Sequence, residues 1–493
     1  MNLSRYLIKG LSFLFLPTFY RFQQVLKHPL KAQYNIKKKI LKQLSLTVYG
    51  QSLGIHKNST WQDIPIVTYD DLETWIKQQR KQPDMPILTA NKIYFWEQTS
   101  GSSGAKKWIP YTAALIGSFS RMFCIWAYDL IHYSVDFCTG KTYLCISPQI
   151  GNSDVGIDDT EYLSPPLRWL SRQFLVRLDR QHFPDQNSFR WELAIALLSA
   201  VDLEILSLWS PSFLTIQLDF IQTHHQELAA ALGNKISLTR RKYLLEIPIP
   251  WEQLWPELKL ISCWDRMYAA DQSQSLRQYF PTVFIQGKGL LATEAPMTIP
   301  LVGAAGFVPL VNQIVLEFIA PDGEILGVTE LQQNVIYELV ISQLGGLVRY
   351  RIGDRLKVSH WYYQTPCLEF VGRGNQVSDL VGEKLTVDFV QQILQKLGVL
   401  DWGFCFLAPV LTNPPHYCLF LERSPLSAVD IARSLEAALQ TGFHYCHARS
   451  LGQLDPAQVT INPNITAQCR EEKRLGDRKY PLLQVEPFDP FFD

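Results

Sequence analysis

The residues between Tyr94 and Thr112 combine hydroxyl groups, glycines and lysines in a pattern suited to binding phosphate. Gly101 and Gly104 can adopt positive φ and bring backbone N–H groups close to an anion. Further hydrogen-bond donors come from the hydroxyls of Thr99, Ser100, Ser102 and Ser103. Lys107 would add a point charge beside the phosphate oxygens, and a helix beginning near Thr112 would add its positive end. The spacing differs from the GxxxxGK[ST] loop of nucleotidases, so a flexible surface turn stays open as an alternative.

Two acidic residues stand in turns where they could serve the same nucleotide. Thr293 and Glu294 follow a strand and a glycine turn, and a carboxylate there is a hard ligand for the Mg²⁺ that accompanies a nucleoside triphosphate. Asp354 follows Gly353 in the segment GLVRYRIGDR, where its two oxygens could hold ribose hydroxyls. Each could also be an ordinary turn or surface acid.

Hydrophobic patterns indicate three modules that would position these residues. Strand-like and helix-like segments alternate first, which predicts an α/β domain. The expected strands are Lys92–Gln98, Thr142–Ile146, Val201–Leu208, Leu258–Cys263 and Thr282–Gln286, and the expected helices are Ala113–Tyr133 and Phe213–Leu232. The period then changes to two, which predicts a distorted antiparallel sheet or partial barrel. Its expected strands are Ile314–Ile319, Tyr337–Ile341, Leu347–Tyr350, Arg355–Val358 and Leu368–Val371.

A small α+β domain is expected to follow a boundary near Arg373–Gln376. Its predicted elements are a helix at Val387–Leu397, a strand at Tyr417–Leu421 and a helix at Ala428–Leu439. Gly374 would let the chain pivot there. We therefore expect a large domain over residues 1–374 and a small, mobile domain over residues 375–493.

Composition excludes several classes of protein. The 493 residues contain 46 basic and 46 acidic side chains, so the overall charge favours neither nucleic acid nor an anionic membrane. Nine cysteines occur singly without a CxxC pair, which is a poor disulfide framework and favours a reducing cytoplasm. The apolar stretch Leu7–Tyr20 is too short to span a bilayer. It is expected to be a helix packed on the body of the protein, with a weak peripheral membrane contact as the alternative.

Taken in order, the segments TSGSSGAKK, ATE, YRIGD, GR and GEKL resemble the motifs of the adenylate-forming enzyme superfamily. Within it, the chain is most similar to the auxin-responsive acyl-acid amido synthetases and their bacterial relatives. That family carries a Thr-Ser-Gly-Thr-Ser loop, a Tyr-x-Ala-Ser-Glu segment and a Tyr-Arg-x-Gly-Asp segment. This chain supplies Thr99–Ser103, Leu291–Glu294 and Tyr350–Asp354 in the same order. Ser102 and Thr293 keep the family's hydroxyl, whereas Leu291 replaces its usual Tyr.

The resemblance implies a two-stage reaction. A carboxylic acid attacks ATP to give an acyl-adenylate and pyrophosphate, and an amine, expected to be an amino acid, then displaces AMP to form an amide. ATP and Mg²⁺ are the implied cofactors. An acyl-CoA or acyl-carrier-protein ligase would share the same ATP site and differ only in its acceptor. A catalytically inactive nucleotide-binding relative is the third alternative.

The resemblance also implies roles for individual residues. The phosphates would be held by the loop and Lys107, and the metal by Glu294. Lys479 in the segment GDRKYP is the candidate for a lysine that the small domain delivers during adenylation, although it could equally be a surface charge. The implied nucleotide-binding residues are Thr99, Ser100, Gly101, Ser102, Ser103, Gly104, Thr293, Tyr350, Asp354 and Arg373.

Overall fold

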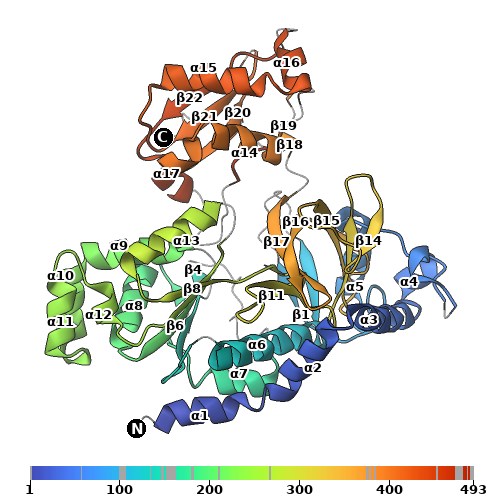
Figure 1. The fold of residues 1–493 in the computed structure, drawn as a ribbon, viewed down its shortest axis with the longest axis horizontal. Helices are drawn as coiled ribbons and strands as arrows, with labels where there is room; N and C mark the ends of the chain where they lie inside the picture. The colour runs from blue at the N-terminus through green and yellow to red at the C-terminus, as the bar shows by residue number, and fades with distance from the viewer. Residues whose placement is uncertain are drawn as a thin grey trace. The chain divides into compact units, whose positions relative to one another are not determined.

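The computed structural model of the chain is shown in Figure 1. It describes residues 3–56, 58–98, 107–133, 135–145, 149–150, 163–178, 182–208, 211–265, 268–373, 377–378, 380–381, 383, 385–412, 414–450, 453–471, 481–485 and 487–488. The chain divides into two compact units. The first comprises Met1–Ile352 and Leu356–Val371, and the second comprises Gly353–Arg355 and Gly372–Asp493.

Helices dominate the start of the first unit. In chain order they are α1 (Leu3–Ser12), α2 (Leu16–Leu26), α3 (Pro29–Leu44), α4 (Val48–Ser52), the 3₁₀ turn η1 (Trp61–Asp63) and α5 (Tyr69–Lys81). Proline stands in the first turn of α2 and of α3, where its missing N–H costs nothing. Thr68 and Asp71 form a capping box at the start of α5, which fixes the beginning of that helix.

A four-stranded parallel sheet forms the α/β part of the first unit. Its order is β3 (Lys141–Leu144), β6 (Leu203–Ser207), β7 (Leu260–Cys263) and β8 (Phe284–Gly287), and every neighbouring pair is parallel. A short parallel pair, β4 (Gln149–Ile150) and β5 (His182–Phe183), lies outside this sheet. The accompanying helices are α6 (Ala113–Tyr133), α7 (Pro165–Ser171), α8 (Gln186–Ser199), α9 (Pro211–Thr223), α10 (His225–Leu232), η3 (Gly233–Lys235), α11 (Leu238–Leu245), α12 (Trp251–Leu254) and α13 (Tyr268–Tyr279). The single helix expected over Phe213–Leu232 is therefore two helices, interrupted at His224, whose ψ of 21° departs from helical geometry.

The first unit also contains a five-stranded sheet, which the change in hydrophobic periodicity predicted. Its order is β14 (Ile325–Gly327), β13 (Val315–Ile319), β15 (Ile336–Ser342), β16 (Tyr350–Tyr362) and β17 (Thr365–Arg373). The strand expected at Leu347–Tyr350 is wrong, because Gly346 and Arg349 have φ of 123° and 47° and turn the chain before β16 begins. Three hairpins complete the unit: β1 (Ile93–Gln98) with β2 (Trp108–Thr112), β9 (Leu291–Ala292) with β10 (Ala295–Pro296), and β11 (Thr298–Leu301) with β12 (Gly306–Pro309).

The first unit has two large apolar cores. One joins α2, α3, α5, α6 and the hairpins to the five-stranded sheet, and the other lies between the parallel sheet and its helices. Helix α6 is long and apolar enough to cross a membrane by length and composition alone. In this fold Leu115, Ile125 and Tyr128 of α6 lie in the first core, so core packing accounts for its apolar sequence.

The second unit is a small α+β domain. A short pair, β18 (Val377–Ser378) and β19 (Leu385–Thr386), precedes a sheet of β20 (Cys405–Val410), β21 (His416–Leu421) and β22 (Gln458–Ile461), with β20 antiparallel and β22 parallel to β21. Its helices are α14 (Val387–Lys396), η4 (Val399–Trp402), α15 (Ala428–Leu439), α16 (Phe443–Ser450) and α17 (Ile465–Glu471). The predicted helices and strand of this domain are confirmed. All nine cysteines lie in the described residues, and none of them forms a disulfide.

Candidate active site

The hydroxyl-rich segment lies between the two strands of the β1–β2 hairpin. Glu97 pairs with Ile109 and Gln98 with Trp108, so both strands are paired up to the edge of the described residues. Six predicted phosphate-binding residues lie outside the described residues: Thr99, Ser100, Gly101, Ser102, Ser103 and Gly104. Helix α6 spans Ala113–Tyr133 as expected, and strand β2, which was not expected, separates it from this loop. Five residues of strand span about 16 Å along the hairpin, and a contribution of the helix end to phosphate binding stays a prediction.

Lys107 is the first described residue after that segment, and it lies against α5. Its Nζ is 5.5 Å from the centroid of the Tyr69 ring, a cation–π contact. The Tyr69 hydroxyl accepts a hydrogen bond of 2.8 Å from the backbone N–H of Trp108. The guanidinium of Arg80 stacks on the Trp108 ring at 3.7 Å. Helix α5 therefore holds the start of β2 in place beside Lys107.

Tyr111 connects this hairpin to the predicted metal-binding turn. Its side chain is fully buried, and its ring stacks on Phe95 with 4.7 Å between centroids. Its hydroxyl donates a hydrogen bond of 2.8 Å to the backbone carbonyl of Thr293. Thr293 and Glu294 form the two-residue turn between β9 and β10, since Ala292 pairs with Ala295. The structure thus brings together the phosphate-loop hairpin and the turn that carries Glu294.

Glu294 is 8% exposed, so its carboxylate is held in a largely buried position. Mg²⁺ is usually coordinated by one or two carboxylates together with phosphate oxygens. The carboxylate of Glu294, shielded from water in a two-residue turn, is a hard oxygen ligand of this kind. The donor set of this turn is therefore compatible with the predicted metal role.

The YRIGD segment occupies the start of β16. Tyr350 is 1% exposed and packs in the first core, and its neighbours Arg349 and Arg351 make backbone hydrogen bonds with Val67. Gly353 has φ of 86°, and Asp354 after it is 4% exposed. Tyr350 thus anchors the strand, while its predicted contact with the nucleotide stays a prediction. Asp354 belongs by its contacts to the second unit.

Three further predicted residues lie wholly or partly outside the described residues. Arg373 is the last residue of β17, and its side chain lies outside the described residues. Gly374 and Lys479 also lie outside them. Within the second unit, Arg355 forms an ion pair with Asp388 in the first turn of α14.

The carboxyl edge of the parallel sheet holds a polar cluster that the sequence analysis did not single out. Lys288, directly after β8, donates a hydrogen bond of 2.6 Å to the hydroxyl of Ser207 at the end of β6. The indole N–H of Trp126 donates to Gln286 Oε1 at 2.8 Å. A Cβ added at Gly287 would lie 2.3 Å from Asp265 Oδ1. Ligands of open α/β sheets bind at the carboxyl ends of the strands, so this edge is a candidate ligand-binding position. In the sequence, the feature that could have indicated this cluster is Lys288 in the turn GKGLLATEA.

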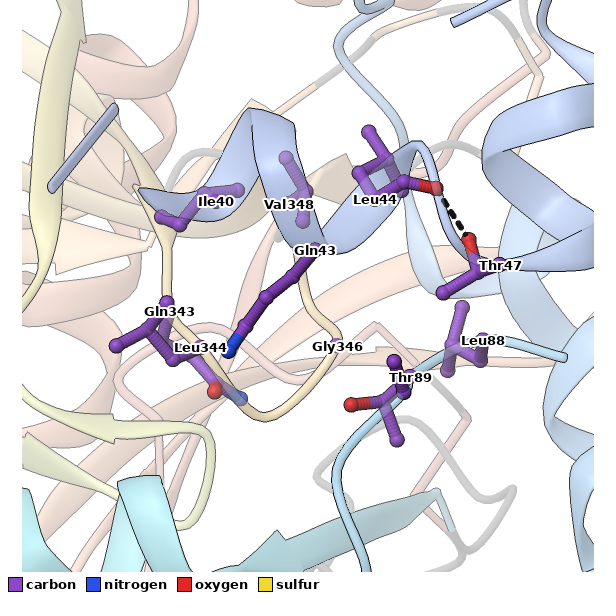
Figure 2. A pocket seen from close by; sticks show the side chains of 11 residues that line it. Ile40, Gln43, Leu44, Thr47, Leu88, Thr89, Gln343, Leu344, Gly346 and Val348 are labelled. Atoms are coloured by element: carbon purple, nitrogen blue, oxygen red, sulfur yellow. Dashed lines mark hydrogen bonds between the residues drawn. The ribbon is translucent and has the colours of Figure 1, made fainter. Parts of the chain in front are cut away.

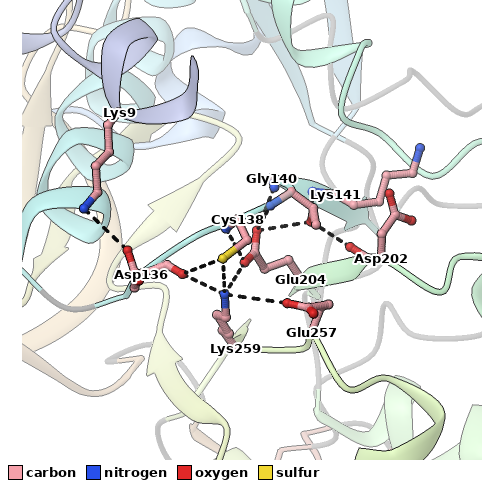
Figure 3. Close-up of polar contacts among 10 residues, drawn as sticks. Lys9, Asp136, Cys138, Gly140, Lys141, Asp202, Glu204, Glu257 and Lys259 are labelled. Carbon is pink, nitrogen blue, oxygen red and sulfur yellow. Dashed lines mark hydrogen bonds and ion pairs between the residues drawn. The ribbon is translucent and has the colours of Figure 1, made fainter. Parts of the chain in front are cut away.

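A second polar cluster, at the amino ends of the same strands, is structural. Figure 3 shows Glu204 at its centre, where it accepts hydrogen bonds from the backbone N–H groups of Cys138, Thr139 and Gly140. The ammonium of Lys259 lies 2.7 Å from Glu204 and 3.9 Å from Glu257. Burial lowers the pKa of Lys259, but its hydrogen bonds with Glu204 and Cys138 outweigh burial and raise the pKa overall. This ammonium already supplies the positive charge that the acidic residues require, so the cluster is not a metal site.

The small pocket in Figure 2 is also unsuited to a substrate. It lies between α3 and the turn after β15, lined by Gln43, Thr89 and Gln343 among others. Its volume is about 10 Å³, which is room for one water molecule.

Comparison with known proteins identifies the family. Residues 18–285 match the GH3 family N-terminal domain, and residues 307–373 match the GH3 family central domain. The first match alone spans more than half of the chain, so the chain belongs to the GH3 family.

The solved structure of the GH3.15 acyl acid amido synthetase in complex with 2,4-DB has the same fold. It superimposes with a TM-score of 0.77 at 17% sequence identity, covering 95% of this chain and 94% of that chain. The expected fold, an α/β domain with a further sheet followed by a small α+β domain, is thereby confirmed.

The curated relatives are plant enzymes. The chain is 29% identical to the jasmonoyl–L-amino acid synthetase GH3.5 of Oryza sativa subsp. japonica over 33% of this chain and 31% of the relative. It is 24% identical to the probable indole-3-acetic acid-amido synthetase GH3.11 of the same species, over 50% and 48%. The chain thus matches less than half the length of these two relatives. With the jasmonoyl–L-amino acid synthetase JAR6 of Nicotiana attenuata it is 24% identical over 94% of each.

Proposed function

We propose that this protein activates a carboxylic acid with ATP as an acyl-adenylate and transfers the acyl group to an amine, most simply an amino acid. The observation that carries the proposal is the Tyr111 hydroxyl bound to the Thr293 carbonyl, which fixes the phosphate-loop hairpin to the turn bearing Glu294. Membership of the GH3 family and the match to JAR6 over 94% of each chain support it.

In this proposal the protein's contribution to adenylation is positioning and neutralisation of charge. Phosphoryl transfer needs these more than covalent chemistry. The loop from Thr99 to Gly104 and Lys107 hold the phosphates, and Asp354 and Arg373 hold the ribose. Glu294 would hold Mg²⁺, which when bound would supply positive charge to offset the charge that shifts to pyrophosphate.

The polar cluster at the carboxyl edge of the parallel sheet is proposed to receive the acid. Lys288 supplies a positive charge there that attracts a carboxylate, and Ser207 holds its ammonium in place at 2.6 Å. Trp126, fixed by Gln286, offers an aromatic wall for the acyl chain.

We also propose that the second unit is the small domain, covering residues 375–493, and that it rotates between the two stages and delivers Lys479. The chain crosses between the units three times, and two of the crossings are at Gly353 and Gly372, whose φ values of 86° and 144° favour glycine. Such positions can absorb the backbone changes of a hinge. The absence of a disulfide among the nine described cysteines supports a reducing, cytoplasmic location.

The proposal is tested by ATP–pyrophosphate exchange with the purified protein over a panel of aryl and alkyl carboxylic acids. Exchange that depends on one class of acid supports adenylation. Binding of ATP without exchange for any acid would instead indicate a catalytically inactive relative. Mass spectrometry with an amino-acid mixture, in parallel with coenzyme A, then separates amide from thioester formation.

A further inference from the structure

The overall neutrality of the chain conceals a separation of charge. The first 62 residues contain ten lysines and arginines and no aspartate or glutamate. Because the whole chain is neutral, the residues after position 62 carry a net charge of −10. Nine of these ten basic residues lie in or between α1, α2 and α3, which begin the first unit and lie along its lower edge in Figure 1.

The inner faces of α1, α2 and α3 attach these helices firmly to the first unit. Ser12 of α1 makes a hydrogen bond of 2.9 Å with His132. Phe19 of α2 packs on the Tyr128 ring, with 4.7 Å between centroids. Gln33 of α3 donates to the carbonyls of Val311 and Ile314 at 2.7 and 2.8 Å and accepts from Leu316 N–H at 3.0 Å. The helices are therefore fixed parts of the fold, and their outer faces are left to solvent.

Those outer faces carry large apolar side chains. Leu14, in the turn between α1 and α2, is 67% exposed, and Tyr34 of α3 is 66% exposed. Scattered apolar residues are normal on a surface, but this group is concentrated in consecutive elements. Its members are Tyr6, Phe13, Leu14, Leu16, Tyr20, Leu30 and Tyr34.

Basic side chains share these faces. On α3, Leu30, Tyr34, Lys38 and Lys42 follow one another at intervals of four residues, so they form one stripe opposite the buried Ile36 and Ile40. The exposed basic residues are Arg21, Lys31, Lys38, Lys39 and Lys42. Two other basic residues are engaged elsewhere, because Lys9 pairs with Asp136 at 3.5 Å and Lys37 lies over the Trp61 ring at 5.2 Å.

We propose that this surface, the N-terminal face formed by the seven exposed apolar and five exposed basic residues named above, binds the surface of an anionic lipid bilayer. Tyr and Phe favour the headgroup level, leucines insert among the acyl chains, and lysines attract anionic headgroups. Peripheral attachment of this kind needs both signals, apolar insertion and charge, and the face supplies both.

Other occupants fit the face less well. A second copy of the chain would bring two strongly positive surfaces into contact, which opposes association. A nucleic acid would use the lysines but would leave Leu14, Leu16 and Phe13 without an apolar partner. A bilayer satisfies both kinds of side chain at once.

The test is sedimentation of the full-length protein with two kinds of vesicle, phosphatidylcholine alone and phosphatidylcholine mixed with phosphatidylserine. We expect binding to the mixed vesicles only, weakened by added salt. Lys38→Glu with Lys39→Glu should lower the partition coefficient at least about 25-fold, at roughly fivefold per lysine. Leu14→Ser should lower it about tenfold.

Matched controls lie on α11 and η3. Lys235→Glu with Lys242→Glu makes the same charge change at exposed positions, and Leu238→Ser removes a leucine that is 85% exposed. Both controls should bind mixed vesicles as the parent does. Absence of binding to mixed vesicles overturns the proposal, as does an equal loss in the controls. The proposal is also overturned if Leu14→Ser abolishes a dimer and leaves vesicle binding unchanged. It is equally overturned if Lys38→Glu with Lys39→Glu weakens binding of a DNA duplex and leaves vesicle binding unchanged.

Discussion

The Tyr111 hydroxyl donates a hydrogen bond of 2.8 Å to the Thr293 carbonyl, joining residues 182 positions apart in the sequence. Tyr111 lies on β2, which continues from the phosphate-binding segment, and Thr293 precedes Glu294 in the β9–β10 turn. One fully buried side chain therefore sets the distance between the parts proposed to hold the phosphates and the metal.

Tyr111→Phe should slow adenylation by more than the loss of folded protein accounts for. The substitution removes one hydrogen bond and leaves the Thr293 carbonyl without this donor, at a cost of about 1 kcal/mol in the free energy of unfolding. Adenylation is measured by pyrophosphate exchange and stability by urea unfolding. Tyr337→Phe is the matched control, because the Tyr337 hydroxyl accepts a hydrogen bond of 2.8 Å from the Gln332 N–H. If both variants lose equal activity, Tyr111 has only a structural role.

Glu294→Gln should depress adenylation most strongly at low Mg²⁺ and recover partly as Mg²⁺ rises. The amide keeps the size of the side chain but removes the charge that binds the metal. The measurement is a Mg²⁺ titration of pyrophosphate exchange, with Glu324→Gln at an exposed turn as the control. A Glu294→Gln profile that matches the parent at every concentration would show that Glu294 does not bind the metal.

Asp354→Ala should weaken ATP binding by on the order of 1.5–3 kcal/mol, the value of charge-assisted hydrogen bonds to ribose hydroxyls. Calorimetric titration with ATP measures the loss. Asp322→Ala, at an exposed turn, should leave the affinity unchanged. An unaltered affinity in Asp354→Ala contradicts the ribose assignment.

Lys479→Ala should slow formation of the acyl-adenylate and leave its conversion to amide nearly intact, because the lysine is proposed to act in only one orientation of the small domain. Pyrophosphate exchange reports the first stage, and synthetic acyl-adenylate with amine reports the second. Gly374→Pro, which restricts φ at the proposed hinge, should instead impair passage between the stages. Unchanged exchange in Lys479→Ala would make this lysine a surface residue.

Asp129 gives a prediction for the pH dependence of stability. Burial raises its pKa from 3.8 to about 6, against the hydrogen bond of 2.6 Å that it accepts from Val302 N–H. Between these two values the folded state binds more protons than the unfolded state, so this group makes stability fall as pH rises through that window. Asp129→Asn removes the effect. Relative to the parent, the variant should gain on the order of 2 kcal/mol between pH 4 and pH 7 in urea unfolding, whereas a constant difference contradicts the shift.

The sequence predicted much of this fold because the local patterns were strong. The alternation around Ile314–Ile319 and Tyr337–Ile341 predicted β13 and β15, and the amphipathic stretch at Ala428–Leu439 predicted α15. Strand β2 was missed because Pro110 within Trp108–Thr112 argues against a strand, whereas the start of α6 at Ala113 was predicted correctly.

The contacts that define the site could not be predicted from local sequence patterns. The link from Tyr111 to Thr293 and the one from Lys288 to Ser207 each join distant segments, and only the tertiary fold brings them together. The core packing of Tyr350, which anchors β16, was not predicted either, and the ligand contact that its motif predicts stays a prediction.

The most direct test of the central claim uses a carboxylic acid, chosen by pyrophosphate exchange, that is labelled with heavy oxygen at both carboxylate positions. If the acid attacks the α-phosphorus of ATP and an amine then displaces AMP, one labelled oxygen must appear in AMP and one must stay in the amide. Mass spectrometry of both products reads the outcome. Label in inorganic phosphate with ADP as the nucleotide product, or unlabelled AMP, would contradict the acyl-adenylate route.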